Sequence, residues 1–334
     1  MQPDHVPDLD HLQRAYAETK KATVVTPLLE APAIAALSGA AHVFVKSESL
    51  QWTGSFKSRG AYWRLKTLSA DEAQKGVVAY SSGNFAQGLA ASGQRLGIPV
   101  TMVMPMDAPA AKRDATAGYG ARVVLTDHGA RAREEVASER ARQIAEDEGL
   151  TLLHPFDHPE VVAGQAGVGI EALAQLDERG AKADFVFVPT GGGGLVSGVS
   201  LAFKYLSPAT QMVVVEPERF NGMGASLEAG SAQTVPLTTP PSICDGMMAR
   251  RPGVATFAAM STIGALPVTV ADDAVRSAMR IAFEKLKLVF EPSAASSLAA
   301  LLSGSVDVRG KAVLVVATGG NVGLADFMRH IADA

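Results

Sequence analysis

The sequence predicts an α/β fold built on a mostly parallel sheet. Short runs of β-branched residues alternate with longer, alanine-rich segments of helical pattern, which is typical of strands joined by helical crossovers. Several expected strands are apolar throughout, as are strands that a parallel sheet buries on both faces. Glycine is abundant, with 32 residues in a chain of 334, as expected where strands pass through tight turns into helices.

The expected strands are short runs rich in valine and other apolar residues. In chain order they lie at 42–45 (HVFV), 77–80 (VVAY), 100–104 (VTMVM), 122–125 (RVVL), 185–189 (FVFVP), 212–216 (MVVVE) and 312–317 (AVLVVA). The longer segments between them carry apolar residues at helical spacing. Helices are therefore expected at 57–68, 84–96, 130–147, 160–177, 195–205, 272–288 and 293–303.

The composition excludes several classes of function. Apolar residues make up 47% of the chain, enough for a sizeable core, and the net charge of −4 leaves no basic stripe for a nucleic acid. No window reaches ~18 uninterrupted apolar residues, so no membrane span is expected. Cys244 is the only cysteine, which excludes an intrachain disulfide and favours a reducing compartment. The first residues, MQPDHVP, lack the pattern of a signal peptide. We expect a cytoplasmic protein.

A run of four glycines is the first candidate site. The segment 190–195 (TGGGGL) follows an expected strand and precedes an expected helix. Glycines let the backbone approach an anion closely, and a helix start offers free N–H groups and the positive end of its dipole. The segment lacks the lysine of a Walker loop and the spacing of a dinucleotide fingerprint. It is interpreted as a phosphate site, with a flexible connection as the alternative.

Two further turns have the same strand–turn–helix context. In 81–85 (SSGNF), Ser81 or Ser82 could cap the following helix, or Asn84 could contact a ring hydroxyl while the serines contact a substrate. In 317–322 (ATGGNV), Thr318 could be a helix cap or a polar contact to a heteroaromatic nitrogen. Taken singly, neither turn decides between its two interpretations.

Lys57 suggests that the three turns bind parts of one cofactor. A lysine at a helix start is usually solvated, whereas one that forms a Schiff base needs partial desolvation or cationic neighbours to be neutral. The neighbours Trp52, Phe56 and Arg59 are compatible with that need. The three turns suit a phosphate, a ring hydroxyl and a ring nitrogen. Together with Lys57 they point to pyridoxal phosphate held as a Schiff base.

No metal site is expected. His154 and His158 are four residues apart, but Pro155 and Pro159 prevent a regular helix that would bring both imidazoles onto one face.

Five motifs in one order resemble a known family, the fold type II pyridoxal-phosphate enzymes of the threonine/serine dehydratase and serine racemase group. They are 26–28 (TPL), 55–60 (SFKSRG), 81–84 (SSGN), 191–194 (GGGG) and 318–322 (TGGNV). The resemblance covers nearly the whole chain. It implies two open, twisted, mostly parallel sheets flanked by helices. It also implies a large cofactor-binding domain of residues 1–75 and 151–334, a small domain of residues 76–150, and a homodimer.

The resemblance further implies a role for each site residue. Lys57 and Ser82 would be the catalytic residues, acting as acid/base groups on opposite faces of the cofactor. Asn84 would contact the ring hydroxyl and Thr318 the ring nitrogen, with Phe56 packed near the ring. The phosphate would bind Gly191, Gly192, Gly193, Gly194 and Leu195. Substrate contacts would come from Ser81, Ser82, Gly83, Arg133 and Glu291.

Two departures from the family pattern are visible. Phe85 stands where most relatives carry histidine, and Ala86 replaces a glycine, so a more apolar or differently shaped substrate pocket is expected. Glu216 matches one ligand of the cation site of the racemases, but Gly222 stands where an aspartate is expected.

The activity implied is that of a lyase in amino-acid catabolism. A dehydratase (ammonia-lyase) of this family converts a β-hydroxy amino acid such as L-threonine or L-serine to a 2-oxo acid and ammonia. The alternatives are a serine or amino-acid racemase, or a dehydratase of a hydroxyaspartate or phenylserine. A more remote alternative is a non-catalytic phosphometabolite-binding protein that uses 191–194 alone.

Overall fold

The computed structural model describes residues 6–129 and 131–332. The chain forms two compact units. The larger unit comprises Met1–Phe56 and Phe156–Ala334, and the smaller unit is Lys57–Pro155. No helix within the described ranges is long and apolar enough to cross a membrane.

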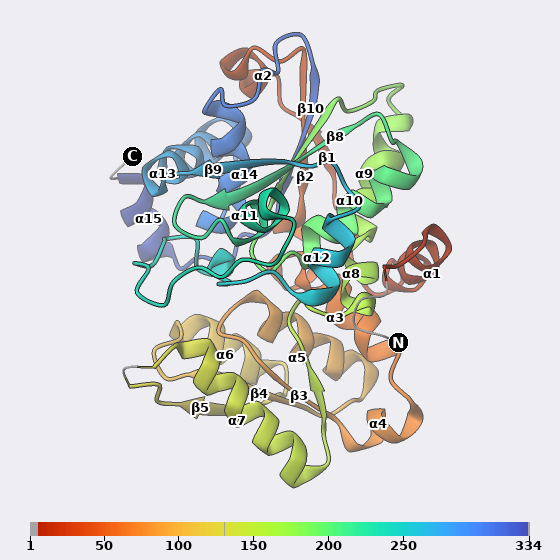
Figure 1. Ribbon diagram of the computed structural model, residues 1–334, viewed down its shortest axis with the longest axis vertical. Coiled ribbons are helices and arrows are strands. Elements are labelled where there is room, and N and C mark those ends of the chain that lie inside the picture. Colours follow the sequence, from red (N-terminus) through yellow and green to blue (C-terminus); the bar gives the residue numbers. More distant parts are fainter. Residues whose placement is uncertain (1–5, 130, 333–334) are drawn as a thin grey trace. The chain divides into compact units, whose positions relative to one another are not determined.

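The larger unit is built on a six-stranded sheet of order β1-β2-β10-β7-β8-β9 (Figure 1). Only β1 is antiparallel to its neighbour, and the remaining pairs are parallel. The strands are β1 (Leu28–Glu30), β2 (His42–Ser47), β7 (Phe185–Pro189), β8 (Gln211–Pro217), β9 (Leu266–Val270) and β10 (Ala312–Ala317). The short edge strands β1 and β9 were not expected from the sequence, because neither has the continuous apolar run of a central strand.

The central strands of this sheet are buried on both faces. In β10, Val313 and Val315 belong to one apolar cluster, which includes residues of α2, α13, α14 and α15. Leu314 and Val316 belong to another, which includes residues of α9 and α10. This arrangement explains why the strand is apolar at every position.

The helices of the larger unit are mostly short. They are α1 (Leu9–Thr19), α2 (Pro32–Ser38), α8 (Pro159–Gln165), α9 (Gly167–Asp177), α10 (Gly194–Leu206), α11 (Gly222–Ala229), α12 (Val254–Met260), α13 (Asp272–Ile281), α14 (Pro292–Leu302) and α15 (Leu324–Ala332). The single helix expected at 160–177 is two helices, which break at Ala166. The helix expected at 272–288 is regular only to Ile281, and a π-turn follows it.

The smaller unit has a four-stranded parallel sheet of order β5-β4-β3-β6. Its strands are β3 (Val77–Tyr80), β4 (Val100–Pro105), β5 (Arg122–Thr126) and β6 (Thr151–Leu153). Its helices are α3 (Lys57–Lys66), α4 (Ala70–Lys75), α5 (Asn84–Leu96), α6 (Ala110–Gly118) and α7 (Arg133–Glu148). The helix expected at 130–147 is α7, and residue 130 lies outside the described residues. The expected α/β class with two mostly parallel sheets is confirmed.

The division of the chain differs from the expected domains at residues 57–75 and 151–155. Both segments were expected in the large domain, whereas their contacts put them in the smaller unit. Residues 151–155 belong there because β6 pairs with β3. For residues 57–75, the physical reason is the packing of α3 along α5. Gly88 of α5 makes that packing close, because a Cβ there would lie 3.0 Å from the carbonyl carbon of Lys57 and the nitrogen of Ser58.

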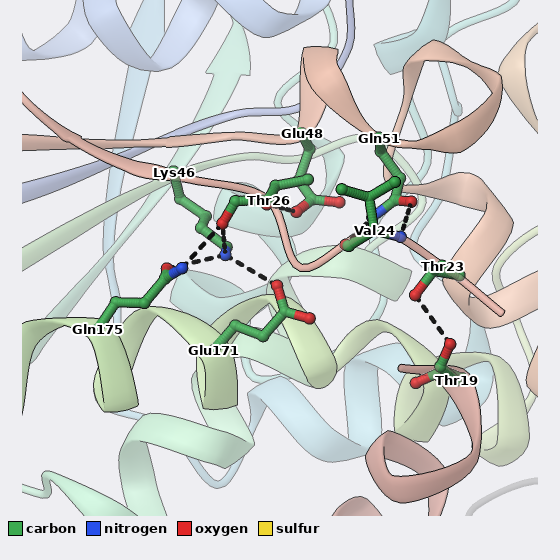
Figure 2. Close-up of polar contacts among 9 residues, drawn as sticks. All are labelled: Thr19, Thr23, Val24, Thr26, Lys46, Glu48, Gln51, Glu171 and Gln175. Atoms are coloured by element: carbon green, nitrogen blue, oxygen red, sulfur yellow. Dashed lines mark hydrogen bonds and ion pairs between the residues drawn. The ribbon is translucent and has the colours of Figure 1, made fainter. Parts of the chain in front are cut away.

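A buried ion pair connects β2 to α9 in the larger unit (Figure 2). The Lys46 Nζ donates to the Glu171 Oε2 at 2.8 Å, the Gln175 Oε1 at 3.0 Å and the Thr26 carbonyl at 2.7 Å. The side chains of Lys46 and Glu171 are both fully buried. A buried charge is tolerated only when it is paired and hydrogen-bonded, and this lysine meets both conditions.

Removing one partner of this pair is expected to destabilise the protein. Replacing Glu171 with Gln leaves the Lys46 charge without its counter-ion, and losses of this kind are about 3–5 kcal/mol. Denaturant unfolding of the wild type and E171Q measures the loss. The exposed pair of Lys75 and Asp71 provides the control, because D71N should cost less than about 1 kcal/mol. An E171Q variant as stable as D71N would contradict the importance of the buried pair.

Candidate active site

The four-glycine loop joins β7 to α10 in the larger unit. Gly193 is the N-cap residue of α10 and has a left-handed φ of 99°. The Ser197 N–H donates to the Gly193 carbonyl at 2.9 Å. The N–H groups of Gly194, Leu195 and Val196 lie in the first turn, where a helix has no carbonyl partners of its own. These groups form a helix N-terminus of the kind that binds phosphate.

The glycines of this loop are required by close packing. A Cβ on Gly192 would lie 2.2 Å from the ring of Phe156, and one on Gly193 would lie 2.5 Å from the Met223 Cε. The loop is also held by hydrogen bonds, because the Gly192 carbonyl accepts from the Thr256 Oγ1 at 2.7 Å. The alternative of a flexible connection is therefore wrong.

Asp157 and Thr256 support the loop and were missed by the sequence analysis. The Asp157 carboxylate accepts from the N–H groups of Val254 and Ala255 at 2.9 and 2.8 Å, at the start of α12. Thr256, in the same helix, reaches the loop at Gly192. The only sequence signal was an aspartate among the prolines and histidines of 154–159, and nothing in it indicated a partner about 100 residues away.

The turn after β10 carries Thr318, which is 3% exposed. The Thr318 carbonyl accepts from the Phe56 N–H at 3.1 Å, and the Gly319 carbonyl accepts from the Glu291 N–H at 3.1 Å. A Cβ on Gly319 would lie 2.5 Å from the Glu291 Oε1. The larger unit thus brings together Phe56, Thr318 and Glu291. Their contacts with a cofactor or a substrate remain predictions. The interpretation of Thr318 as a helix cap is wrong, because α15 begins only at Leu324.

Lys57 is the first residue of α3 in the smaller unit. The residue is half-buried, which is less exposed than an ordinary surface lysine. The Lys57 Nζ lies 3.5 Å from the Pro155 carbonyl oxygen and 5.9 Å from the centre of the Phe85 ring. Phe85 itself is 1% exposed and belongs to the apolar core of this unit.

The turn after β3 leads directly into α5. The N-cap residue is Gly83, and no side chain caps the helix, so the interpretation of Ser81 or Ser82 as the cap is wrong. Instead the Ser81 Oγ accepts from the Gly83 N–H at 3.2 Å within the turn. A Cβ on Gly83 would meet nothing within 4 Å. The first N–H groups of α5, beginning at Asn84, form a second helix N-terminus of the type that binds anions.

Arg133 begins α7 and is paired with a carboxylate. Its Nε lies 3.2 Å from the Asp107 Oδ1. The His128 Nε2 lies 3.5 Å from the other oxygen of Asp107. A contact between Arg133 and the substrate remains a prediction.

Glu216 is the penultimate residue of β8, and its carboxylate is hydrogen-bonded within the protein. Its two oxygens accept from the N–H groups of Met223 and Gly224, both at 2.8 Å. Burial raises the pKa of Glu216 to about 8, while these hydrogen bonds act in the opposite direction. Within the described part of the chain, no cluster of three or more histidine, cysteine, aspartate or glutamate side chains could hold a metal ion.

Comparison with known proteins identifies the class to which this fold and these residues belong. The family model of the pyridoxal-phosphate dependent enzymes matches residues 20–319, and the chain belongs to this family. It is 40% identical to an L-threo-3-hydroxyaspartate ammonia-lyase of Saccharomyces cerevisiae, over 86% of this chain and 85% of the relative. It is 37% identical to an L-threonine ammonia-lyase of Thermotoga maritima, over 94% and 75% respectively.

The fold is also shared with solved structures of related enzymes. The structure of maize serine racemase superposes with a TM-score of 0.89 at 31% identity, covering 98% of each chain. The chain is thus a pyridoxal-phosphate dependent enzyme whose relatives include ammonia-lyases and racemases. The remote alternative of a non-catalytic binding protein is not supported by any of these relatives.

The residues present fit the cofactor. The start of α10 offers N–H groups for the phosphate, and close packing excludes side chains from the loop that precedes it. Lys57 provides a half-buried amine, and Thr318 a buried hydroxyl.

A side chain at Gly192 is expected to weaken cofactor binding. In Gly192→Ala the new methyl group must displace the loop from Phe156, and overpacking of this kind costs about 1–3 kcal/mol. The affinity of the apoenzyme for pyridoxal phosphate should fall roughly tenfold or more, as measured by absorbance titration. Gly118→Ala is the matched control, because a Cβ there meets nothing within 4 Å. Equal affinities in the two variants would contradict the requirement for close packing.

Divalent cations are expected to leave the stability unchanged. Backbone N–H groups already bind both oxygens of Glu216, and Gly222 has no side chain to add. Thermal unfolding with Mg²⁺, with Ca²⁺ and with a chelator should give the same midpoint, because a cation that binds the folded state must raise it. A midpoint that rises with cation concentration would contradict this prediction.

Proposed function

We propose that this enzyme is a dehydratase that converts a β-hydroxy amino acid, such as L-threonine or L-serine, to a 2-oxo acid and ammonia. The observation that carries the proposal is the environment of Lys57. A half-buried amine at a helix start, beside a carbonyl oxygen and an aromatic ring, suits a group that must accept a proton. The similarity to two ammonia-lyases supports the same reaction class.

The binding groups come from two helix starts. In the proposal, the N–H groups of Gly191, Gly192, Gly193, Gly194 and Leu195 hold the cofactor phosphate. Ser81, Ser82 and Gly83 hold the substrate carboxylate at the start of α5, where backbone N–H groups favour an anion. Asn84 contacts the ring hydroxyl, Phe56 packs near the ring, and Thr318 contacts the ring nitrogen. Arg133 and Glu291 contact the substrate.

The reaction then needs one proton transfer by Lys57. When bound, pyridoxal phosphate withdraws electrons from the substrate Cα and so makes its proton acidic. The neutral Lys57 amine accepts that proton. The electron pair left on Cα forms a double bond to Cβ as the Cβ–O bond breaks. The leaving hydroxide takes a proton from the solvent and departs as water, and Lys57 returns its proton to the solvent. The released enamine becomes an imine, and its hydrolysis gives the 2-oxo acid and ammonia.

Racemisation is the second candidate reaction, because it shares the same first step. The similarity to maize serine racemase favours it. A racemase needs a second acid on the opposite face of Cα, and Ser82 would take that role. The alternative substrates, a hydroxyaspartate or a phenylserine, use the same chemistry. Of these, the hydroxyaspartate has support from the yeast relative.

A cytoplasmic location and a homodimer remain predictions from the sequence and the family resemblance.

Lys57 is expected to be indispensable. The wild type should release a 2-oxo acid from at least one of L-threonine, L-serine and the 3-hydroxyaspartates. K57A should lose activity by roughly 10³-fold or more, because both proton transfer and cofactor attachment are lost. Borohydride treatment should fix the cofactor to the peptide that contains Lys57. K66A is the matched control, because Lys66 is an exposed residue at the end of the same helix.

Two outcomes would contradict the proposal. Inversion of the substrate without any 2-oxo acid would favour the racemase. Retention of full activity by K57A would remove both candidate reactions.

A further inference from the structure

The turn that precedes Lys57 has unusual backbone geometry. Thr53 and Gly54 both have left-handed φ angles, 68° and 72°. Glycine adopts this conformation freely, but β-branched residues such as threonine rarely do. Such a conformation persists only where the surroundings hold it, and these sites are concentrated where function needs a defined geometry.

The turn is held by the segment that contains Thr318. The Phe56 N–H donates to the Thr318 carbonyl at 3.1 Å, and the Gly320 N–H donates to the Gly54 carbonyl at 3.0 Å. Between these two bonds, Ser55 and Gly319 form an isolated antiparallel bridge. We call the paired segments 53–56 and 318–321 the clasp.

Asn321 closes the clasp at its strained end. Its Nδ2 donates to the Thr53 carbonyl at 2.8 Å. Its Oδ1 lies close against Gly54, where a Cβ would approach it to 2.3 Å. One carboxamide therefore contacts both residues of this turn that have a positive φ.

The chain before the turn is held independently. The Gln51 Oε1 accepts from the Val24 N–H at 2.8 Å, and the Gln51 Nε2 donates to the Val24 carbonyl at 2.7 Å (Figure 2). The Thr26 Oγ1 donates to the buried Glu48 carboxylate at 2.5 Å. Because these contacts restrain the segment up to Gln51, loss of the Asn321 contact should be absorbed locally, between Thr53 and Phe56.

We propose that Asn321 is a positioning residue for the cofactor, an inference that rests on the function proposed above. Its carboxamide holds the turn at Thr53 and Gly54, and the clasp sets the position of Phe56 with respect to Thr318. Lys57 is the next residue along the chain. Asn321 therefore acts on the catalytic lysine through the backbone, without contacting the reacting atoms.

The test compares Asn321→Ala and Asn321→Asp with the wild type, each as the holoenzyme. Ala removes the hydrogen bond, and Asp puts a carboxylate oxygen against the Thr53 carbonyl. The matched control is Ser297→Ala. The Ser297 Oγ donates to the Val316 carbonyl at 2.9 Å, so this variant also loses a bond to the main chain, two residues before Thr318.

Three quantities separate positioning from stability. Both Asn321 variants should lower kcat roughly 10- to 100-fold, because small displacements of a reacting group have effects of that size, while KM changes little. The visible circular dichroism of the bound cofactor, which reports its orientation, should change. The rate at which pyridoxal phosphate attaches to Lys57, when it is added back to the apoenzyme of each variant, should fall. S297A should lower the thermal midpoint by a similar amount and leave kcat, dichroism and attachment rate unchanged.

The outcomes are distinct. A lower midpoint with unchanged dichroism and attachment rate in both Asn321 variants would overturn the proposal and leave Asn321 a structural residue. If Ala prevents folding, Asp, which keeps the size of the side chain, decides the question by the same measurements. If the wild type produces no 2-oxo acid at all, the proposed reaction fails. Dichroism and attachment rate then still decide the role of Asn321.

Discussion

Burial of the central strands on both faces is the constraint on which the larger unit depends. Apolar clusters cover both faces of β10, β7 and β8, and these strands run parallel. Their carboxyl ends therefore meet at one edge of the sheet, where open α/β sheets place their ligands. The glycine loop follows β7, Thr318 follows β10, and Glu216 lies near the end of β8.

Three charged groups near this edge are satisfied within the protein. Lys46 and Glu171 are paired in the interior, and backbone N–H groups bind Glu216. Because an unsatisfied buried group is costly, such contacts also restrict how the chain can move. The turn at Thr53 and Gly54 is restrained in the same way, because the Asn321 carboxamide donates a hydrogen bond to the Thr53 carbonyl.

Several expectations failed, one because of a neighbouring residue and others because of residues distant in the sequence. The serines of 81–84 have good capping propensity, but Gly83 takes the cap position and accommodates a serine oxygen within the turn. Segment 57–75 joins the smaller unit because Gly88, which is remote in sequence, admits α3 against α5. A flexible connection was one expectation for the four glycines, but Phe156, Met223 and Thr256 pack closely against them.

The sequence by itself determined the fold class, the central strands and the positions of Lys57, the glycine loop and Thr318. These features follow from local patterns: apolar runs, strand–turn–helix junctions and ordered motifs. Only the tertiary structure decided what holds those groups. Asp157 reaches α12, and Asn321 reaches Thr53 across 268 positions of the chain. Because these hydrogen bonds are made to backbone groups, they do not depend on the side chain of the partner residue. The sequence therefore carries no signal that would pair Asp157 with α12 or Asn321 with Thr53.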